Sequence, residues 1–149
     1  MSTDGLSVDD GIRTLLLLMP RMVGRVKRLK VPEALQALSL APRHLSLLSY
    51  LQFDGSMTVN ELAGRLEVAP ATVSLMVGEL SRKGVLERRE DDADRRRTIV
   101  SIADGHQDSI DEWLGYGAQA WRRALAPLTP AQRRMFVDTL LAYEQALSG

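Results

Sequence analysis

The stretch from Met57 to Ile102 constrains the fold of this chain more than any other part. Thr58 and Glu61 have the spacing of a capping box, and apolar residues then recur at helical spacing, so a helix is predicted here. After a short turn, Pro70 suits the first position of a second helix, where proline has no hydrogen bond to lose. Two helices joined by so short a turn are typical of a helix-turn-helix.

The second helix has two contrasting faces. Four apolar residues at i, i+3, i+4 and i+7 predict a buried face: Val73, Met76, Val77 and Leu80. The opposite face begins with short side chains, which suit a helix that enters the DNA major groove, about 12 Å wide. On this interpretation Ala71 and Leu75 contact thymine methyl groups. Thr72 and Ser74 then bind bases or phosphates, and Arg82 binds phosphate. A surface helix that packs against protein explains this helix alone equally well.

A charged hairpin is predicted after this helix. Gly84 suits the helix end, and strands are expected at Val85–Arg89 and Thr98–Ile102. The segment between the strands is too charged to pack, so it projects into water or onto a polyanion. Asp94 beside two arginines holds a guanidinium in one orientation, which suits the negative potential of a narrow minor groove. A solvated turn is the plainer explanation of the same charges.

Helix, turn, helix and a hairpin with an Asp-Arg-Arg tip follow one another in an order that resembles the MarR family of bacterial transcription regulators. The resemblance rests on APATVSLMVGELSRKGVLERRE and DADRRRTIVSI, with APRHLSLLSYL before them and ADGHQDSI after them. It covers nearly the whole chain, and the D-x-R element before a strand is its most specific part. The resemblance implies an obligate homodimer with a winged helix-turn-helix in each subunit. It also implies binding to pseudopalindromic double-stranded DNA operators, often with release by a small phenolic or other ligand.

The resemblance also implies roles for particular residues. In the wing, Arg96 enters the minor groove, Asp94 orients it, and Arg95 lies nearer to phosphate. Together with the pattern of the second helix, this defines the candidate DNA contacts: Arg43, Thr58, Pro70, Ala71, Thr72, Ser74, Leu75, Arg82, Asp94, Arg95 and Arg96. Arg43 is the weakest of them, because a solvated charge explains it better. A pocket for a small aromatic effector is expected where the dimerisation helices meet the DNA-binding region, lined by Met22, Val26, His44 and Leu48.

Two departures from the family pattern have consequences. Leu75 stands where many members carry a basic residue in the second helix, which leaves the operator sequence open. Ala41 and Ala69 stand where threonine or serine often caps a helix, and each missing cap costs ~1 kcal/mol.

The flanking segments predict amphipathic helices at Val8–Leu29, Pro42–Phe53, Asp104–Leu125 and Thr129–Ser148. The apolar stripes of the first and last are wide for one small domain and indicate a partner subunit. The expected fold class is mainly α with a small β-hairpin wing. Residues 1–149 are expected to form a single domain, with the DNA-binding region at 38–103 and dimerisation helices at 6–37 and 104–148.

For the proline and the tryptophans of these helices, the sequence allows more than one interpretation. Pro20, inside the first helix, is expected to kink it or to free a backbone carbonyl. Trp113 and Trp121 fit a subunit interface, where large aromatic residues are enriched, but ordinary core explains them too.

Composition narrows the possible functions. The chain has no cysteine, which excludes disulfides, zinc-thiolate sites and thiol-based redox sensing. The apolar run Leu15–Met19 is too short to span a bilayer and lacks a cleavage site behind it, so the protein is expected to be cytoplasmic, with no membrane partner. His44 and His106 have no further ligands at metal-site spacing, and no phosphate loop or nucleophile elbow is present. No catalytic residue, metal, cofactor or enzymatic activity is therefore expected.

Two functions of different class remain. The favoured prediction is a sequence-specific transcriptional regulator, a ligand-responsive repressor that binds its operator as a homodimer. The alternative is a helical dimer that binds only protein, with a degenerate winged module. Leu75 on the exposed face and a formal net charge of zero favour the alternative. The Asp-Arg-Arg tip and the basic segments Arg21–Lys30 and Arg82–Arg97 favour DNA.

Overall fold

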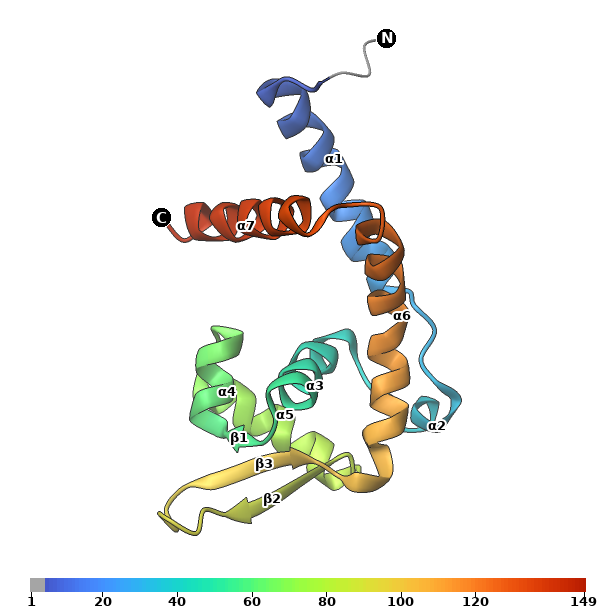
Figure 1. Ribbon diagram of the computed structural model, residues 1–149. Helices are drawn as coiled ribbons and strands as arrows, with labels where there is room; N and C mark the ends of the chain where they lie inside the picture. The colour runs from blue at the N-terminus through green and yellow to red at the C-terminus, as the bar shows by residue number, and fades with distance from the viewer. Residues whose placement is uncertain (1–4) are drawn as a thin grey trace. The chain divides into compact units, whose positions relative to one another are not determined.

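The chain folds mainly into helices with one small antiparallel sheet (Figure 1), which confirms the expected fold class. The computed structural model describes residues 5–149, so the first four residues of the predicted domain lie outside the described part. In chain order the elements are α1 Val8–Lys27, α2 Glu33–Gln36, α3 Pro42–Asp54, β1 Met57–Thr58, α4 Val59–Leu66, α5 Pro70–Arg82, β2 Leu86–Glu90, β3 Thr98–Ile102, η1 Asp104–His106, α6 Gln107–Leu125 and α7 Pro130–Leu147. Contacts group the chain into two compact units, Met1–Leu114 and Gly115–Gly149, with the boundary inside α6. The expected division into a DNA-binding region and dimerisation helices stays a prediction.

The core of the first unit is built around the helix-turn-helix. The predicted buried face of α5 is confirmed, and α5 packs against α4 and β2. In α3, Leu47, Leu48 and Leu51 are buried, whereas Leu45 is only half-buried. Further buried apolar side chains come from α2, α4, the sheet and α6: Leu35, Leu62, Ala63, Leu86, Val100, Ile102, Ile110 and Trp113. Because burial stabilises by about 25 cal/mol per Å² of apolar surface, this core holds α5 in a fixed position on its neighbours.

The sheet has three strands in the order β1-β3-β2, whereas the sequence predicted two. Met57 of β1 pairs with Val100 of β3, and Leu86 of β2 pairs with Ile102. The short β1 was missed because two residues cannot show the alternation that identifies a strand. Its pairing connects the start of α4 directly to Ile99 and Val100 of β3, so the wing and the helix-turn-helix share one sheet.

The ends of the helices differ in how far they follow the predicted caps. At α4, the N–H of Glu61 donates to Thr58 Oγ1 at 3.1 Å, as the capping box requires. The Glu61 carboxylate, however, binds Arg97 of the hairpin instead of the cap backbone. At α7, Thr129 and Gln132 form both hydrogen bonds of the capping box. α1 continues through Pro20 and ends at Lys27, two residues before the predicted end.

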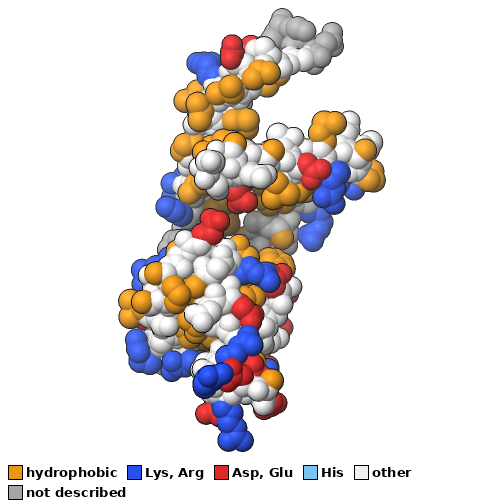
Figure 2. All heavy atoms as spheres, turned by 90° about the vertical axis from the view of Figure 1, so that its left-hand side faces the viewer, with side chains coloured by type: hydrophobic (Ala, Val, Ile, Leu, Met, Phe, Trp, Pro, Cys, Tyr) orange, Lys and Arg blue, Asp and Glu red, His pale blue; other side chains and the backbone are white. Residues whose placement is uncertain are grey.

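Apolar side chains remain exposed on two helices, one in each unit. Along α1 they recur at helical spacing, with no buried residue in the helix: Ile12, Leu15, Leu16, Met22, Val23 and Val26. Figure 2 shows hydrophobic side chains on the surface of α1, at the top of the view. Along α7 the corresponding residues are Met135, Val137, Leu140, Leu141 and Leu147. Exposed apolar faces of this kind mark interaction surfaces in soluble proteins.

The two tryptophans have different surroundings. Trp113 is buried in the core of the first unit. In the second unit Trp121 is half-exposed, and its ring packs against Phe136 with 5.7 Å between the ring centroids. Ordinary core therefore accounts for Trp113 but not fully for Trp121.

Candidate nucleic-acid interface and effector pocket

The outward side of α5 carries most of the candidate DNA contacts. We call this side the recognition face; it consists of Ala71, Thr72, Ser74, Leu75, Gly78 and Arg82. Ala71, Thr72, Ser74, Leu75 and Arg82 are exposed, with Leu75 at 63%, whereas Gly78 is half-buried. Pro70 occupies the first turn and is exposed as well. The structure therefore gathers the predicted contacts of this helix on one surface.

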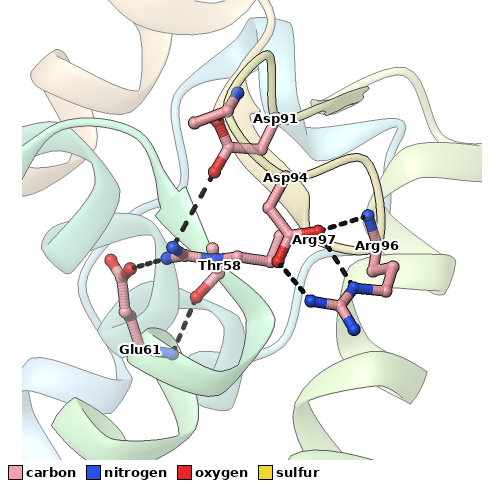
Figure 3. Close-up of polar contacts among 7 residues, drawn as sticks. Thr58, Glu61, Asp91, Asp94, Arg96 and Arg97 are labelled. Atoms are coloured by element: carbon pink, nitrogen blue, oxygen red, sulfur yellow. Dashed lines mark hydrogen bonds and ion pairs between the residues drawn. The ribbon is translucent and has the colours of Figure 1, made fainter.

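The tip of the hairpin holds one arginine in a defined orientation (Figure 3). Asp94 Oδ1 accepts from the backbone N–H of Arg96 at 3.0 Å and from its Nε at 3.1 Å, while Oδ2 accepts from Nη2 at 3.3 Å. These hydrogen bonds hold the pKa of Asp94 below its ordinary value. The Arg96 side chain is 91% exposed, so its guanidinium is positioned but free to meet a ligand. Figure 2 shows charged side chains gathered over the wing, at the bottom of the view.

The third arginine of the tip has a different task, which the sequence did not reveal. Arg97 Nη2 donates to Glu61 Oε1 at 2.8 Å, and its Nη1 lies 3.8 Å from Asp91 Oδ2 (Figure 3). Since Glu61 belongs to the first turn of α4, Arg97 fastens the hairpin to the helix-turn-helix. Arg95 is exposed and has no polar contact with any residue in the described part of the chain. Arg95 is thus free, Arg96 is oriented by Asp94, and Arg97 has a structural role.

Two further candidates lie away from the recognition face. Thr58 is buried, and its hydroxyl oxygen is used in the cap of α4, which makes it a support for that helix. Arg43 lies at the start of α3 with its side chain exposed, and its Nη2 lies 3.3 Å from Glu79 Oε2. The structure therefore does not bring Thr58 and Arg43 together with the exposed residues of α5.

His44 connects α3 to α5 and also caps α3. The N–H of Ala41 donates to His44 Nδ1 at 3.0 Å, the bond that a glutamate or glutamine side chain makes at this position of a capping box. The other ring nitrogen, Nε2, lies 3.3 Å from Glu79 Oε2. Burial lowers the pKa of His44 below 6.5, although the hydrogen bond to Glu79 opposes this. The same hydrogen bond lowers the pKa of Glu79.

A second connection reaches the same segment from the end of α5. Lys83 Nζ donates to the backbone oxygen of Leu38 and lies 3.4 Å from that of Ser39. Glu79 and Lys83 are four residues apart on adjacent turns, so α5 is tied at two points to residues 38–44.

A cavity of about 830 Å³ lies beside this segment, within the first unit. Its lining is mostly apolar, with two basic residues: Met22, Val23, Val26, Lys27, Leu29, Val31, Leu40, Ala41, Arg43, Leu45, Ser46 and Trp113. Met22 and Val26 therefore lie where the effector pocket was predicted. His44 and Leu48 do not line the cavity, because their side chains are turned into the core and are buried there.

The arrangement defines a class of protein: a winged helix-turn-helix with an exposed recognition face, an oriented arginine in the wing and an apolar cavity beside its supporting helix. Residues 38–97 match the model of the MarR family. This segment, which contains the helix-turn-helix with the first strand and the tip of the hairpin, is similar to the MarR family of winged helix-turn-helix transcriptional regulators.

Individual relatives agree with this assignment. The transcriptional repressor MdtR of Bacillus subtilis is 32% identical over 97 residues, which are 65% of this chain and 63% of MdtR. The match thus spans less than two thirds of that relative. MepR of S. aureus, solved in a complex with DNA, superposes with a TM-score of 0.65 at 19% identity, covering 88% of this chain and 96% of MepR. BpsR of Bordetella bronchiseptica, whose DNA binding is regulated by 6-hydroxynicotinic acid, superposes with a TM-score of 0.63 at 19% identity, covering 90% of this chain and 98% of BpsR. Both superpositions show the fold.

In residues 5–149 no helix is long and apolar enough to cross a membrane. The same residues contain no group of three or more histidine, aspartate or glutamate side chains placed to hold a metal ion.

Proposed function

We propose that this protein is a ligand-responsive repressor that binds a pseudopalindromic DNA operator as a homodimer. The observation that carries the proposal is the hold of Asp94 on Arg96, combined with the attachment of the same hairpin to α4 through Arg97 and Glu61. The Arg96 side chain is 91% exposed, yet Asp94 accepts two hydrogen bonds from its guanidinium and a third from the backbone N–H of Arg96. The guanidinium is therefore oriented before any ligand arrives. Such an arginine suits the narrow minor groove, where negative potential is strongest.

The exposed surface of α5 supports the same function. The recognition face presents short side chains at its start, which allow the helix to lie deep in a major groove. The wing belongs to the same compact unit, so major-groove and minor-groove contacts come from one body. The MepR structure, solved with DNA, has this fold.

Homodimer formation is supported by the exposed apolar faces of α1 and α7. A two-fold dimer would place two recognition helices about 34 Å apart, one turn of DNA, and would require an operator of matching symmetry. Both helices belong to the segments that the sequence assigned to dimerisation.

Effector control is supported by the chemistry of the cavity. Its apolar lining suits a planar aromatic body, and Lys27 and Arg43 supply positive charge for an acidic group. An aromatic carboxylic acid is therefore the expected class of effector. The wall of the cavity includes Ala41 and Arg43, which belong to the segment tied to α5, so an effector that moves this wall also moves the recognition helix.

The test is a binding titration on duplex DNA taken from upstream of the gene for this protein, at several salt concentrations. The expected result is tighter binding to this duplex than to a scrambled one, with an affinity that falls linearly with salt on logarithmic axes. A protein that binds neither duplex would favour the alternative function, a dimer that binds only protein, for which the exposed Leu75 is the supporting observation.

A further inference from the structure

Leu75 is a large apolar side chain in the middle of the recognition face. It is 63% exposed, although the opposite side of the same helix is fully buried. Its neighbours one turn away are Ala71, Thr72, Gly78 and Glu79. The first three are small, and the Glu79 carboxylate is bound to His44 and Arg43 of α3. Leu75 therefore projects beyond the surface around it, and any partner that meets α5 meets this side chain first.

Gly78 and Arg82 shape the surface next to Leu75. A methyl group added at Gly78 would meet Arg82 Nη1 at 3.5 Å, so the guanidinium lies over the glycine. Because Gly78 has no side chain, the Arg82 side chain can lie against α5 here. An apolar projection and a cation thus lie side by side, a pairing that fits a base edge and its neighbouring phosphate.

The groups close to Leu75 that can hydrogen-bond a base are the hydroxyls of Thr72 and Ser74, which do not select one base over another. Guanine is read by arginine or lysine and adenine by asparagine or glutamine, and the recognition face has none of these before Arg82. Glu79, which could accept from cytosine, is already bound to His44 and Arg43 at 3.3 Å each. Leu75 would cover the polar edge of a G·C pair without satisfying it, which is unfavourable. The C5-methyl of thymine is the apolar group that the major groove presents.

From this we infer that Leu75 reads a thymine methyl group and makes the protein select an A·T pair at one position of each operator half-site. The inference rests on the proposed function and adds the base chemistry of its central contact. It also gives a reason for a leucine where many family members carry a basic residue.

The experiment has two stages and uses the full-length protein. First, the wild-type protein selects duplexes from a randomised DNA library, which yields an operator sequence directly. Second, each thymine of a selected duplex is replaced by uracil, which removes only the C5-methyl, and affinities are compared at one salt concentration. The matched variants are Leu75→Ala and Phe53→Ala, since Phe53 is also an exposed apolar residue of the first unit but lies outside α5.

At one symmetry-related pair of thymines, each replacement by uracil should weaken duplex binding about fourfold. This loss should be seen with both the wild-type protein and the Phe53→Ala variant. With Leu75→Ala the same uracil substitution should have no effect, and library selection should no longer demand A·T there. A wild-type affinity insensitive to uracil at every position, or an equal loss with Leu75→Ala, would overturn this inference while leaving the proposed function intact. Failure of the wild-type protein to select any duplex would overturn both.

Discussion

His44 Nε2 lies 3.3 Å from Glu79 Oε2, and this contact joins the first turn of α3 to the second half of α5. The backbone N–H of Ala41 can only donate, so His44 Nδ1 accepts and is unprotonated. Nε2 therefore carries the ring proton and donates it to Glu79. A neutral imidazole is required for both contacts, in agreement with the lowered pKa of His44.

The first prediction follows from this protonation state. Because the folded-state pKa of His44 lies below its ordinary value of 6.5, its contribution to stability is complete above about pH 6.5. The contribution should be lost progressively as pH falls from 6.5 toward the lowered pKa. The pKa of Glu79 is also lowered, and its contribution is lost only as pH falls below 4.5, so the two effects separate. Urea unfolding between pH 5 and pH 8 measures the contribution of His44 to the free energy of unfolding.

Two substitutions of His44 make this test specific. His44→Gln keeps an acceptor for Ala41 and a donor for Glu79 but does not titrate, so its stability should vary less over this pH range. His44→Ala should cost roughly 2 kcal/mol at pH 7.5, because it opens a cavity and leaves a buried N–H unpaired. A pH profile of His44→Gln identical to that of the wild type would contradict the assignment.

The second prediction concerns Arg97 and Glu61. Both side chains are half-exposed, so their ion pair should contribute only about 0.2–1 kcal/mol to the free energy of unfolding. Arg97→Ala should lose this amount, and the loss should be smaller when Glu61→Gln is already present, because only the contact between Arg97 and Asp91 at 3.8 Å then remains. Arg95→Ala, next but one in the chain, is the control and should leave stability unchanged. Additive effects of Arg97→Ala and Glu61→Gln in thermal unfolding would show that the pair does not fasten the wing.

The third prediction concerns assembly. Light scattering at micromolar concentration should give the mass of a dimer. Leu16→Glu in α1 and Leu141→Glu in α7 each place a charge on an exposed apolar face, so each should shift the protein toward monomer. Phe53→Glu is the control and should leave the dimer intact. A wild-type protein that is monomeric under these conditions would contradict the homodimer.

The fourth prediction concerns the cavity. Val26→Trp should fill part of the space that an aromatic acid would occupy. The variant should bind operator with unchanged affinity but should no longer release it when 6-hydroxynicotinic acid or a similar aromatic acid is added. Phe53→Trp, at an exposed apolar position of α3 outside the cavity lining, is the control and should keep the response. If the wild-type affinity for operator ignores every aromatic acid tested, effector control through this cavity is not supported.

The parts of the fold that the sequence predicted are those set by local patterns. The period of Val73, Met76, Val77 and Leu80 predicted the buried side of α5, since the same spacing that forms the helix also selects its face. The charged tip predicted a projecting hairpin because a run of neighbouring charges cannot pack into a core, which is also a local property of the sequence.

The missed features depend on residues far apart in the chain. Glu61 and Arg97 are 36 positions apart, and no periodicity relates them. His44 and Glu79 are 35 positions apart, and a histidine that caps its own helix is not a usual cap signature. His44 and Leu48 were assigned to the pocket because a helix position alone does not tell whether a side chain turns toward the cavity or the core.

The central claim is that the wing binds DNA through an oriented arginine. Its most direct test is the affinity for a selected operator duplex, measured by fluorescence anisotropy at several salt concentrations. Arg96→Ala should weaken binding by about 1–3 kcal/mol, and Asp94→Ala should weaken it less. Arg95→Ala should mainly reduce the salt slope, by about one unit. Arg134→Ala removes an exposed arginine that also pairs with an aspartate, but in α7, and is the matched control.

The variant that lacks both Arg95 and Arg96 decides the matter. It should fold and dimerise normally, because neither side chain is buried, and it should bind operator weakly with a flatter salt dependence. If this variant binds operator with the affinity and salt slope of the wild-type protein, the wing has no part in DNA recognition.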